Sequence, residues 1–181
     1  MSKNDEHHQH DATPACCLVV TVSDSRTLET DVGGAAVAAG LERHGHRVLA
    51  RRLVKDEVAA IRAAVLAGIE DERVDAVVLT GGTGISPRDV TPEALQPMLD
   101  RHLPGFGELF RQLSFAAAGP VALLSRALAG VVGTTLVFAL PGSPSACSLG
   151  TEQLIAPVLG HAVVMLDPPR GGVAPGARDR K

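Results

Sequence analysis

The sequence of 181 residues contains no tryptophan and no tyrosine, and it has only four phenylalanines. It therefore lacks the aromatic side chains on which proteins stack the bases of single-stranded nucleic acids. Because 45% of the residues are nevertheless hydrophobic, the volume of the core has to come mainly from alanine, valine and leucine. This profile is typical of an alanine-rich α/β protein whose length suits one compact domain.

Lysine is scarce as well, being present only at Lys3, Lys55 and Lys181. The formal net charge is -3 and the pI is about 6.1. Such a chain has no basic face broad enough to follow a phosphate backbone. We therefore expect no nucleic-acid partner.

The chain has three cysteines, Cys16, Cys17 and Cys147. Neighbouring residues of a strand point to opposite faces, so Cys16 and Cys17 cannot bind one metal together, and all three suit buried positions in a reducing compartment. The N-terminal residues contain no apolar signal segment, and the longest uncharged stretch, 127–151, is broken by glycine and proline. We expect a cytoplasmic protein without a membrane partner.

Both ends of the chain are polar or rich in proline and glycine. Residues 1–14 include three histidines (His7, His8 and His10), which fit a solvated tail better than a site for a soft metal. Residues 168–181 have no apolar period. We predict disordered tails on either side of a folded domain at residues 15–167.

Within the domain, apolar runs alternate with helical patterns. Strands are expected at Cys16–Val22, His46–Val54, Asp75–Leu79, Thr134–Leu140 and, as a short last strand, His161–Leu166. Helices are expected at Gly34–His44, Val58–Ile69 after a cap at Asp56, from a cap at Thr91 onward, Gly107–Phe115 and Ser145–Leu159. This alternation predicts an α/β fold with a largely parallel sheet and helices on both faces.

Four polar loops follow the expected strands. They are Ser23–Arg26, Lys55–Glu57, Thr80–Thr91 and Leu140–Ser145. Ligands of open parallel sheets bind outside the carboxyl ends of the strands. We therefore expect the four loops to meet along one rim and to form the binding site.

The loop after the third strand is rich in glycine. Gly81, Gly82 and Gly84 allow a tight turn whose backbone N–H groups could surround phosphate oxygens. It is not a Walker A loop, because Ile85 and Ser86 follow Gly84 in place of the lysine and hydroxyl residue of that motif. Nor is it a dinucleotide fingerprint, because a proline stands where the third glycine belongs.

Charged residues next to this loop suggest phosphate chemistry. Arg88 offers a planar fork for phosphate, and Asp89 and Asp56 could hold Mg²⁺ for phosphoryl or nucleotidyl transfer. Simpler roles stay open, since Asp56 could only cap its helix and Asp89 could only pair with Arg88. No histidine has the partners of a Ser-His-Asp triad.

Five hydroxyl or acidic positions have two explanations each. Ser143 and Ser145 could donate to a phosphate at a helix N-terminus or could only cap that helix. Ser23 and Asp24 could bind ligand hydroxyls or cap the next segment. For Asp31 the cap is the favoured role.

The segment Thr80-Gly81-Gly82-Thr83-Gly84 through Arg88-Asp89-Val90-Thr91-Pro92-Glu93-Ala94 closely resembles the signature of the MoaB/MogA molybdopterin-binding family. Further segments that carry the resemblance are Val22-Ser23-Asp24, Asp56-Glu57, Pro104-Gly105-Phe106-Gly107-Glu108, Leu124-Ser125-Arg126 and Leu140-Pro141-Gly142-Ser143-Pro144. The likeness covers about residues 16–159 and is closest to the B-type proteins. Ser-Gly-Gly and Asp-Tyr-Asp, typical of the insertase branch, and the paired aspartates of the competence-damage branch are missing.

The resemblance implies a three-layer α/β/α domain that forms homotrimers or homohexamers. Active members are adenylyltransferases, in which the terminal phosphate of molybdopterin attacks the α-phosphate of ATP with the help of Mg²⁺. Asp56 and Asp89 would then be the essential carboxylates that steer Mg²⁺ and the nucleotide. Phosphate, pterin and nucleotide would be bound by Ser23, Asp24, Thr80, Gly81, Gly82, Thr83, Gly84, Arg88, Ser125, Pro141, Gly142 and Ser143. The alternative is a non-catalytic carrier or scaffold that meets other proteins of the pathway.

Overall fold

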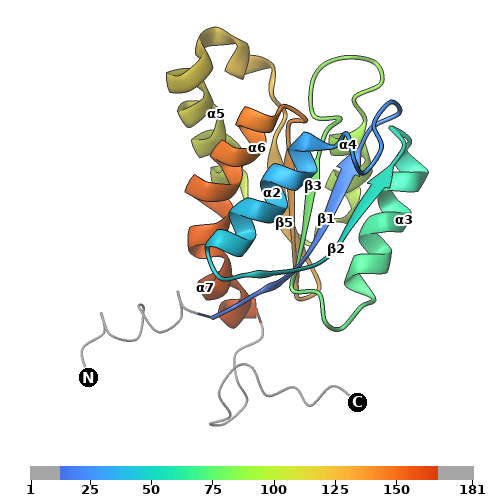
Figure 1. The fold of residues 1–181 in the computed structure, drawn as a ribbon, viewed down its shortest axis with the longest axis vertical. Helices are drawn as coiled ribbons and strands as arrows, with labels where there is room; N and C mark the ends of the chain where they lie inside the picture. The colour runs from blue at the N-terminus through green and yellow to red at the C-terminus, as the bar shows by residue number, and fades with distance from the viewer. Residues whose placement is uncertain (1–12, 167–181) are drawn as a thin grey trace.

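The computed structural model describes residues 13–166, which form a six-stranded sheet between two layers of helices (Figure 1). The strands are β1 (Cys16–Val22), β2 (Arg47–Val54), β3 (Ala76–Thr80), β4 (Arg101–His102), β5 (Leu128–Val132) and β6 (Thr135–Leu140), in the order β2-β1-β3-β6-β5-β4. The first four of these in space are parallel, and β5 and β4 add an antiparallel edge. The expected three-layer α/β/α fold with a mostly parallel sheet is confirmed.

Every residue of β1 is buried, because both faces of the strand are covered. Cys17 and Val19 pack on one face and Leu18 and Val20 on the other, as the alternation of side chains along a strand requires. The small side chains of the core leave room for helices to lie close to the sheet. The buried cysteines expected from the sequence are confirmed.

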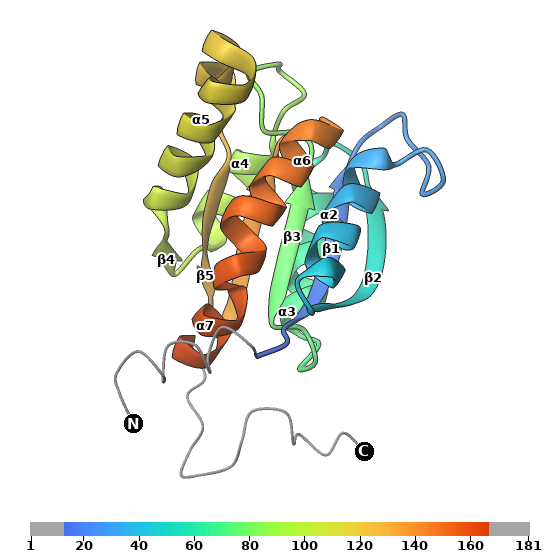
Figure 2. The ribbon, with the colours of Figure 1, turned by 60° about the vertical axis from the view of Figure 1, so that its left-hand side comes forward.

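The helices divide between the two faces of the sheet (Figure 2). One face is covered by α2 (Val32–Arg43), α5 (Pro104–Ala118) and a long helical run made of α6 (Pro144–Gly150), a π-helical segment (Thr151–Ile155) and α7 (Ala156–Leu166). The other face is covered by α3 (Val58–Ile69) and the single-turn α4 (Thr91–Leu95), which continues into a 3-10 turn (Gln96–Met98). A second 3-10 segment (Gly119–Leu124) follows α5.

One expected element differs from the structure, and two strands of the structure were not expected. The strand predicted at His161–Leu166 is wrong, because α7 continues to Leu166. The helical run buries Ile155, Leu159 and Val164 against the sheet, and this burial outweighs the β-branched character of the segment. The short strands β4 and β5 were not predicted. The tails expected at 1–14 and 168–181 lie outside the described residues, except for Thr13 and Pro14.

The β5–β6 hairpin turns at a glycine, which is the sequence signal for such a hairpin. Its two strands pair up to Val132 and Thr135, so that Gly133 and Thr134 form a two-residue turn. Gly133 has φ +60, whereas no described residue other than glycine has a positive φ. This combination is that of a type II′ turn, which joins antiparallel strands with the correct twist.

The helical run from Pro144 to Leu166 is long and apolar enough to cross a membrane, by length and composition alone. Within the fold it is a core helix, because Cys147, Ile155 and Leu159 are fully buried on its inner side. Core helices of this kind meet the same criteria without entering a lipid bilayer.

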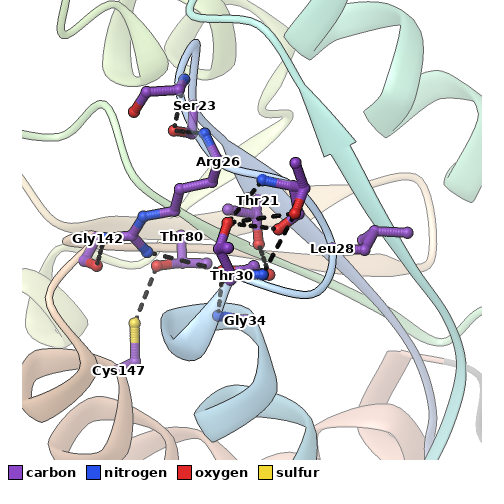
Figure 3. A network of polar contacts seen from close by, with 12 residues as sticks. Thr21, Ser23, Arg26, Leu28, Thr30, Gly34, Thr80, Gly142 and Cys147 are labelled. Atoms are coloured by element: carbon purple, nitrogen blue, oxygen red, sulfur yellow. Dashed lines mark hydrogen bonds and ion pairs between the residues drawn. The ribbon is translucent and has the colours of Figure 1, made fainter.

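A buried acid joins the first two strands to α2. Asp31 caps α2 by accepting a hydrogen bond from the Gly34 N–H, 2.9 Å away. Its other oxygen accepts from the Thr21 hydroxyl and from the Arg51 guanidinium, each at 2.7 Å. Arg26 also forms an ion pair with Asp31, and Figure 3 shows its side chain extending to the Gly142 carbonyl, near Thr21 and Gly34 of this network. The capping role expected of Asp31 is confirmed.

The surroundings of Asp31 favour its charged form. Burial alone would raise the pKa of this carboxyl, but the hydrogen bonds from Thr21, Gly34 and Arg51, with the positive charge of Arg51, outweigh it and lower the pKa below 3.8. A group whose pKa is lowered on folding stabilises the protein above its unfolded pKa and loses that contribution as the pH falls through the folded value.

We predict that Asp31→Asn lowers the free energy of unfolding by about 2 to 4 kcal/mol near neutral pH, because Arg51 loses its buried partner charge. Urea unfolding at pH values from about 7 down to about 3 measures the difference, which should shrink once the pH falls below about 4. Glu152→Gln, which removes an exposed ion pair with Arg43, is the control and should change stability by less than about 0.5 kcal/mol. A penalty for Asp31→Asn that stays constant over this pH range would contradict the assignment.

Candidate functional site

The four loops that follow β1, β2, β3 and β6 meet at one edge of the sheet, as the sequence predicted. The Gly81 N–H donates to the Leu140 carbonyl at 3.0 Å, which joins the third loop to the fourth. Arg26 donates to the Gly142 carbonyl at 3.2 Å, and the backbone N–H of Asp56 donates to the Asp24 carboxylate at 3.3 Å. The parallel order of these strands therefore builds a continuous rim, seen at the upper end of the sheet in Figure 1.

The glycine loop needs its glycines for both conformation and space. Gly81 and Gly82 have φ values of +103 and +63. A Cβ atom at Gly81 would overlap the carbonyl oxygen of Val22, and one at Gly82 would lie 2.5 Å from the Thr91 hydroxyl. Only glycine allows the loop to lie this close to its neighbours.

One of the expected phosphate donors has another role. The backbone N–H of Gly81 donates to the Leu140 carbonyl, so this group already has an acceptor within the protein. No hydrogen bond within residues 13–166 uses the N–H groups of Gly82, Thr83 or Gly84. These three amides are the donors that the loop can offer to a ligand.

Thr91 closes the loop from the other side. Its hydroxyl donates to the Gly81 carbonyl at 2.9 Å, and its N–H donates to the Gly82 carbonyl at 3.0 Å. The predicted cap at Thr91 is wrong, because Val90 occupies the N-cap position and Thr91 is the first helical residue. The contacts of Thr91 with the loop explain the difference.

Two carboxylates lie against the glycine loop. An Asp56 oxygen is 3.3 Å from the position of a Cβ at Gly82, and an Asp89 oxygen is 2.8 Å from that of a Cβ at Gly84. The sequence suggested that Asp56 caps α3, and this prediction is wrong. The N-cap residue is Glu57, whose side chain forms no capping hydrogen bond. The two acids from separate strand ends therefore lie beside one glycine loop.

Negative charge gathers around Asp56. Burial and then the charge of Asp24 raise the pKa of the Asp56 carboxyl, with a smaller contribution from Asp89 and an opposing one from Arg88. Asp89 forms no ion pair with Arg88 in the described part of the chain, and it accepts a hydrogen bond from the Ser86 N–H at 2.8 Å. The alternative that Asp89 serves only to pair with Arg88 is therefore not supported.

A cavity of about 340 Å³ opens beside the loop, between α5, the 3-10 segment that follows it and α6. Six of the residues considered for ligand binding line it: Thr83, Gly84, Ser125, Pro141, Ser143 and Ser145. The rest of the wall is mainly apolar and includes Phe110, Ala122 and Leu149. Ser143 also caps α6 by accepting from the Ala146 N–H, so it can serve the helix and the cavity together.

Thr83 is the most unusual residue of this wall. Its side chain is 2% exposed, and its hydroxyl has no hydrogen-bond partner among the described residues. Buried hydroxyls without a partner are rare, because removing them from water costs free energy that a hydrogen bond would recover. The hydroxyl of Thr83 is therefore available for a hydrogen bond to a ligand in the cavity.

Other predicted residues support the rim without lining the cavity. Thr80 is fully buried, and its hydroxyl lies 2.9 Å from both the Pro141 carbonyl and the Cys147 sulfur (Figure 3). Ser23 accepts from the N–H groups of the two residues that begin the next turn, Ser25 and Arg26. Asp24, Arg88 and Gly142 also belong to the rim outside the cavity.

A family model described as a probable molybdopterin binding domain matches residues 18–161. The chain belongs to this family. Molybdenum cofactor biosynthesis protein B of Bacillus subtilis (strain 168) is 50% identical over 159 residues, covering 87% of this chain and 94% of that protein. The molybdopterin-binding domain therefore extends over nearly all of the described residues.

Solved structures agree with this family. A crystal structure of a molybdenum cofactor biosynthesis protein B is 46% identical, with a TM-score of 0.83, and covers 86% of this chain and 97% of that chain. The tungsten cofactor synthesizing protein MoaB from Pyrococcus furiosus is 32% identical, with a TM-score of 0.76. The match covers 84% of this chain and 97% of that chain. The resemblance to the MoaB/MogA proteins is confirmed.

Within the domain, sequence reasoning missed Arg126 as a residue of the site. Its side chain contacts the loop that carries Asp89, although it follows Ser125 of the cavity wall and is 37 positions from Asp89 in the sequence. The motif Leu124-Ser125-Arg126 was noted for its serine alone. An arginine next to a predicted ligand residue is the signal that could have identified it.

We predict that Gly81→Ala destabilises the molybdopterin-binding domain by more than about 2 kcal/mol, since the new Cβ meets a backbone carbonyl at a positive φ. Gly105→Ala is the matched control, because nothing lies within 4 Å of its Cβ position in the first turn of α5. Chemical unfolding should show the control as neutral or slightly more stable. Equal effects of the two substitutions would refute the steric argument.

Proposed function

We propose that this protein acts in molybdenum cofactor biosynthesis, where it binds molybdopterin in the cavity beside the glycine loop and adenylylates it with ATP and Mg²⁺. The observation that carries this proposal is the unpaired hydroxyl of Thr83, which is buried at the junction of the glycine loop and an otherwise apolar cavity. A pocket with apolar walls and a few placed polar groups is typical of small-molecule sites. The family and the names of its relatives support the choice of a pterin.

The chemistry of the wall suits a ligand with a flat body and a phosphate. Apolar side chains from α5 and α6 would contact the faces of the pterin, and the hydroxyls of Ser125 and Ser143 lie on the same wall to bind polar atoms. The amides of Gly82, Thr83 and Gly84 would bind phosphate oxygens, as such loops do elsewhere. The ligand would thus extend from the cavity to the rim.

The donor set at the rim fits Mg²⁺. Asp24, Asp56 and Asp89 supply hard oxygen ligands, and no group of three His, Cys, Asp or Glu residues within 13–166 is arranged to hold a metal by itself. Mg²⁺ is commonly bound by one or two carboxylates together with substrate phosphates, and when bound it neutralises charge on those phosphates. Asp56 and Asp89 are the residues we assign to hold it.

The protein's own contribution to the reaction is positioning. The cavity would orient the terminal phosphate of molybdopterin toward the α-phosphate of ATP, so that a new P–O bond forms as pyrophosphate leaves. Arg88 would hold nucleotide phosphates with its planar fork. Holding two reacting groups in line accelerates their reaction by removing the entropy cost of their encounter.

We predict that Asp89→Asn lowers turnover by about 100-fold or more, because it removes a charge from the Mg²⁺-binding group, while molybdopterin binding changes little. Purified protein is mixed with ATP, Mg²⁺ and molybdopterin, and pyrophosphate and adenylated pterin are measured. Glu70→Gln, an exposed acid at the far end of α3, is the control and should retain the full rate.

The same assay separates the enzyme from a carrier. If the unmodified protein binds molybdopterin tightly but forms no product, it is a non-catalytic carrier or scaffold for other proteins of the pathway, and the proposed enzymatic activity is excluded. An Asp89→Asn variant with an unchanged rate would remove this acid from the mechanism.

The proposal includes a cytoplasmic homo-oligomer, a trimer or a hexamer. Large apolar side chains are exposed along α5 and the 3-10 segment after it, with Phe115 59% and Leu123 81% exposed. Exposed apolar side chains in such a cluster are typical of surfaces that bind other proteins. Analytical ultracentrifugation tests the assembly, and a monomer at micromolar concentration would exclude it.

A further inference from the structure

Arg126 lies between the cavity and the loop that carries Asp89. It follows Ser125, a residue of the cavity wall, and precedes β5. Its backbone N–H donates to the Thr83 carbonyl at 2.9 Å. The main chain of Arg126 is thus attached to the glycine loop independently of its side chain.

The guanidinium group of Arg126 binds both ends of the next loop. Its Nε donates to the Gly84 carbonyl at 2.7 Å, and its Nη2 donates to the Asp89 carbonyl at 2.6 Å. Its Nη1 is paired with the Glu93 carboxylate. One rigid planar group therefore holds the first and the last residue of the Gly84–Asp89 loop and one residue of α4.

Inside this loop the hydrogen bonds are few and local. The Ser86 N–H donates to the Asp89 carboxylate and the Asp89 N–H donates to the Ser86 carbonyl, both at 2.8 Å. These bonds shape the turn, but they do not attach it to the rest of the domain. The attachment at both ends of the loop comes from Arg126.

We propose that Arg126 is a positioning residue that fixes the Asp89 carboxylate relative to the cavity wall at Ser125. This inference rests on the proposed function. In it, Arg126 sets the distance between the pterin in the cavity and the Mg²⁺ and nucleotide at Asp89. The wall and the loop are far apart in sequence, and Arg126 contacts both. An error of about 1 Å in such a spacing can cost about 100-fold in rate.

Arg126→Lys keeps the positive charge and removes the planar fork, so it tests the geometry and not the charge. We expect kcat to fall by about 10- to 100-fold, while the dissociation constant for molybdopterin changes by less than about threefold. Arg126→Ala should behave alike and should recover part of its rate when millimolar methylguanidinium is added.

Arg62→Ala is the matched control. Arg62 extends from α3 and donates to the carbonyls of Ala94 and Glu93 in α4, at 3.0 and 3.2 Å, without contacting the Gly84–Asp89 loop. The Arg62→Ala substitution removes hydrogen bonds from an arginine to backbone carbonyls, as Arg126→Ala does. If Arg126 were only structural, both variants would lower the melting temperature and leave kcat in place, and that result would overturn the proposal.

Hydrogen exchange gives a measurement that does not need turnover. The Ser86 and Asp89 amides should exchange roughly tenfold faster in Arg126→Ala than in Arg62→Ala, because the loop loses its attachment. If the unmodified protein makes no product, the proposed function fails, and this measurement alone then decides the role of Arg126. Equal exchange in the two variants would refute the positioning role.

Discussion

The parallel pairing of β2, β1, β3 and β6 is the constraint on which the other features of this molecule depend. It places the carboxyl ends of four strands at one edge, where their loops join through short backbone contacts such as that between Gly81 and Leu140. At the same edge, the carbonyl of Val22 at the end of β1 leaves no room for a side chain at Gly81. Residues separated by more than a hundred positions in sequence, such as Arg26 and Gly142, thereby become neighbours.

Charge is distributed at this edge in two ways. Asp31 is surrounded by donors and a positive charge, which favour its ionised form and make it an anchor. Asp56 is near two other acids instead, and burial together with the charge of Asp24 raises the pKa of its carboxyl. The first arrangement holds the loops in place. The second brings three acids together with only the partial opposing charge of Arg88, and our proposal assigns this group to a cation bound with a ligand.

The sequence predicted those parts of the fold and site that depend on local pattern. The strand Cys16–Val22, which is apolar or β-branched throughout, and the glycine signals near Gly81 were enough to predict the sheet and its rim. Features that depend on tertiary contacts were missed or wrong: the cap at Thr91, which contacts the glycine loop instead, and the strand at 161–166, where core packing keeps the chain helical. Arg126 was overlooked because its partners are distant in sequence.

Both borders of the sheet are unsuited to further strand pairing. β4 has only two residues, Arg101 and His102, and the outer strand β2 carries arginines at 47, 51 and 52. Short edges and positive side chains discourage the addition of a strand from another molecule, because desolvating the charges opposes the pairing. Copies of this protein that associate would therefore do so through surfaces other than these strand edges, and amyloid-like growth from the native state is disfavoured.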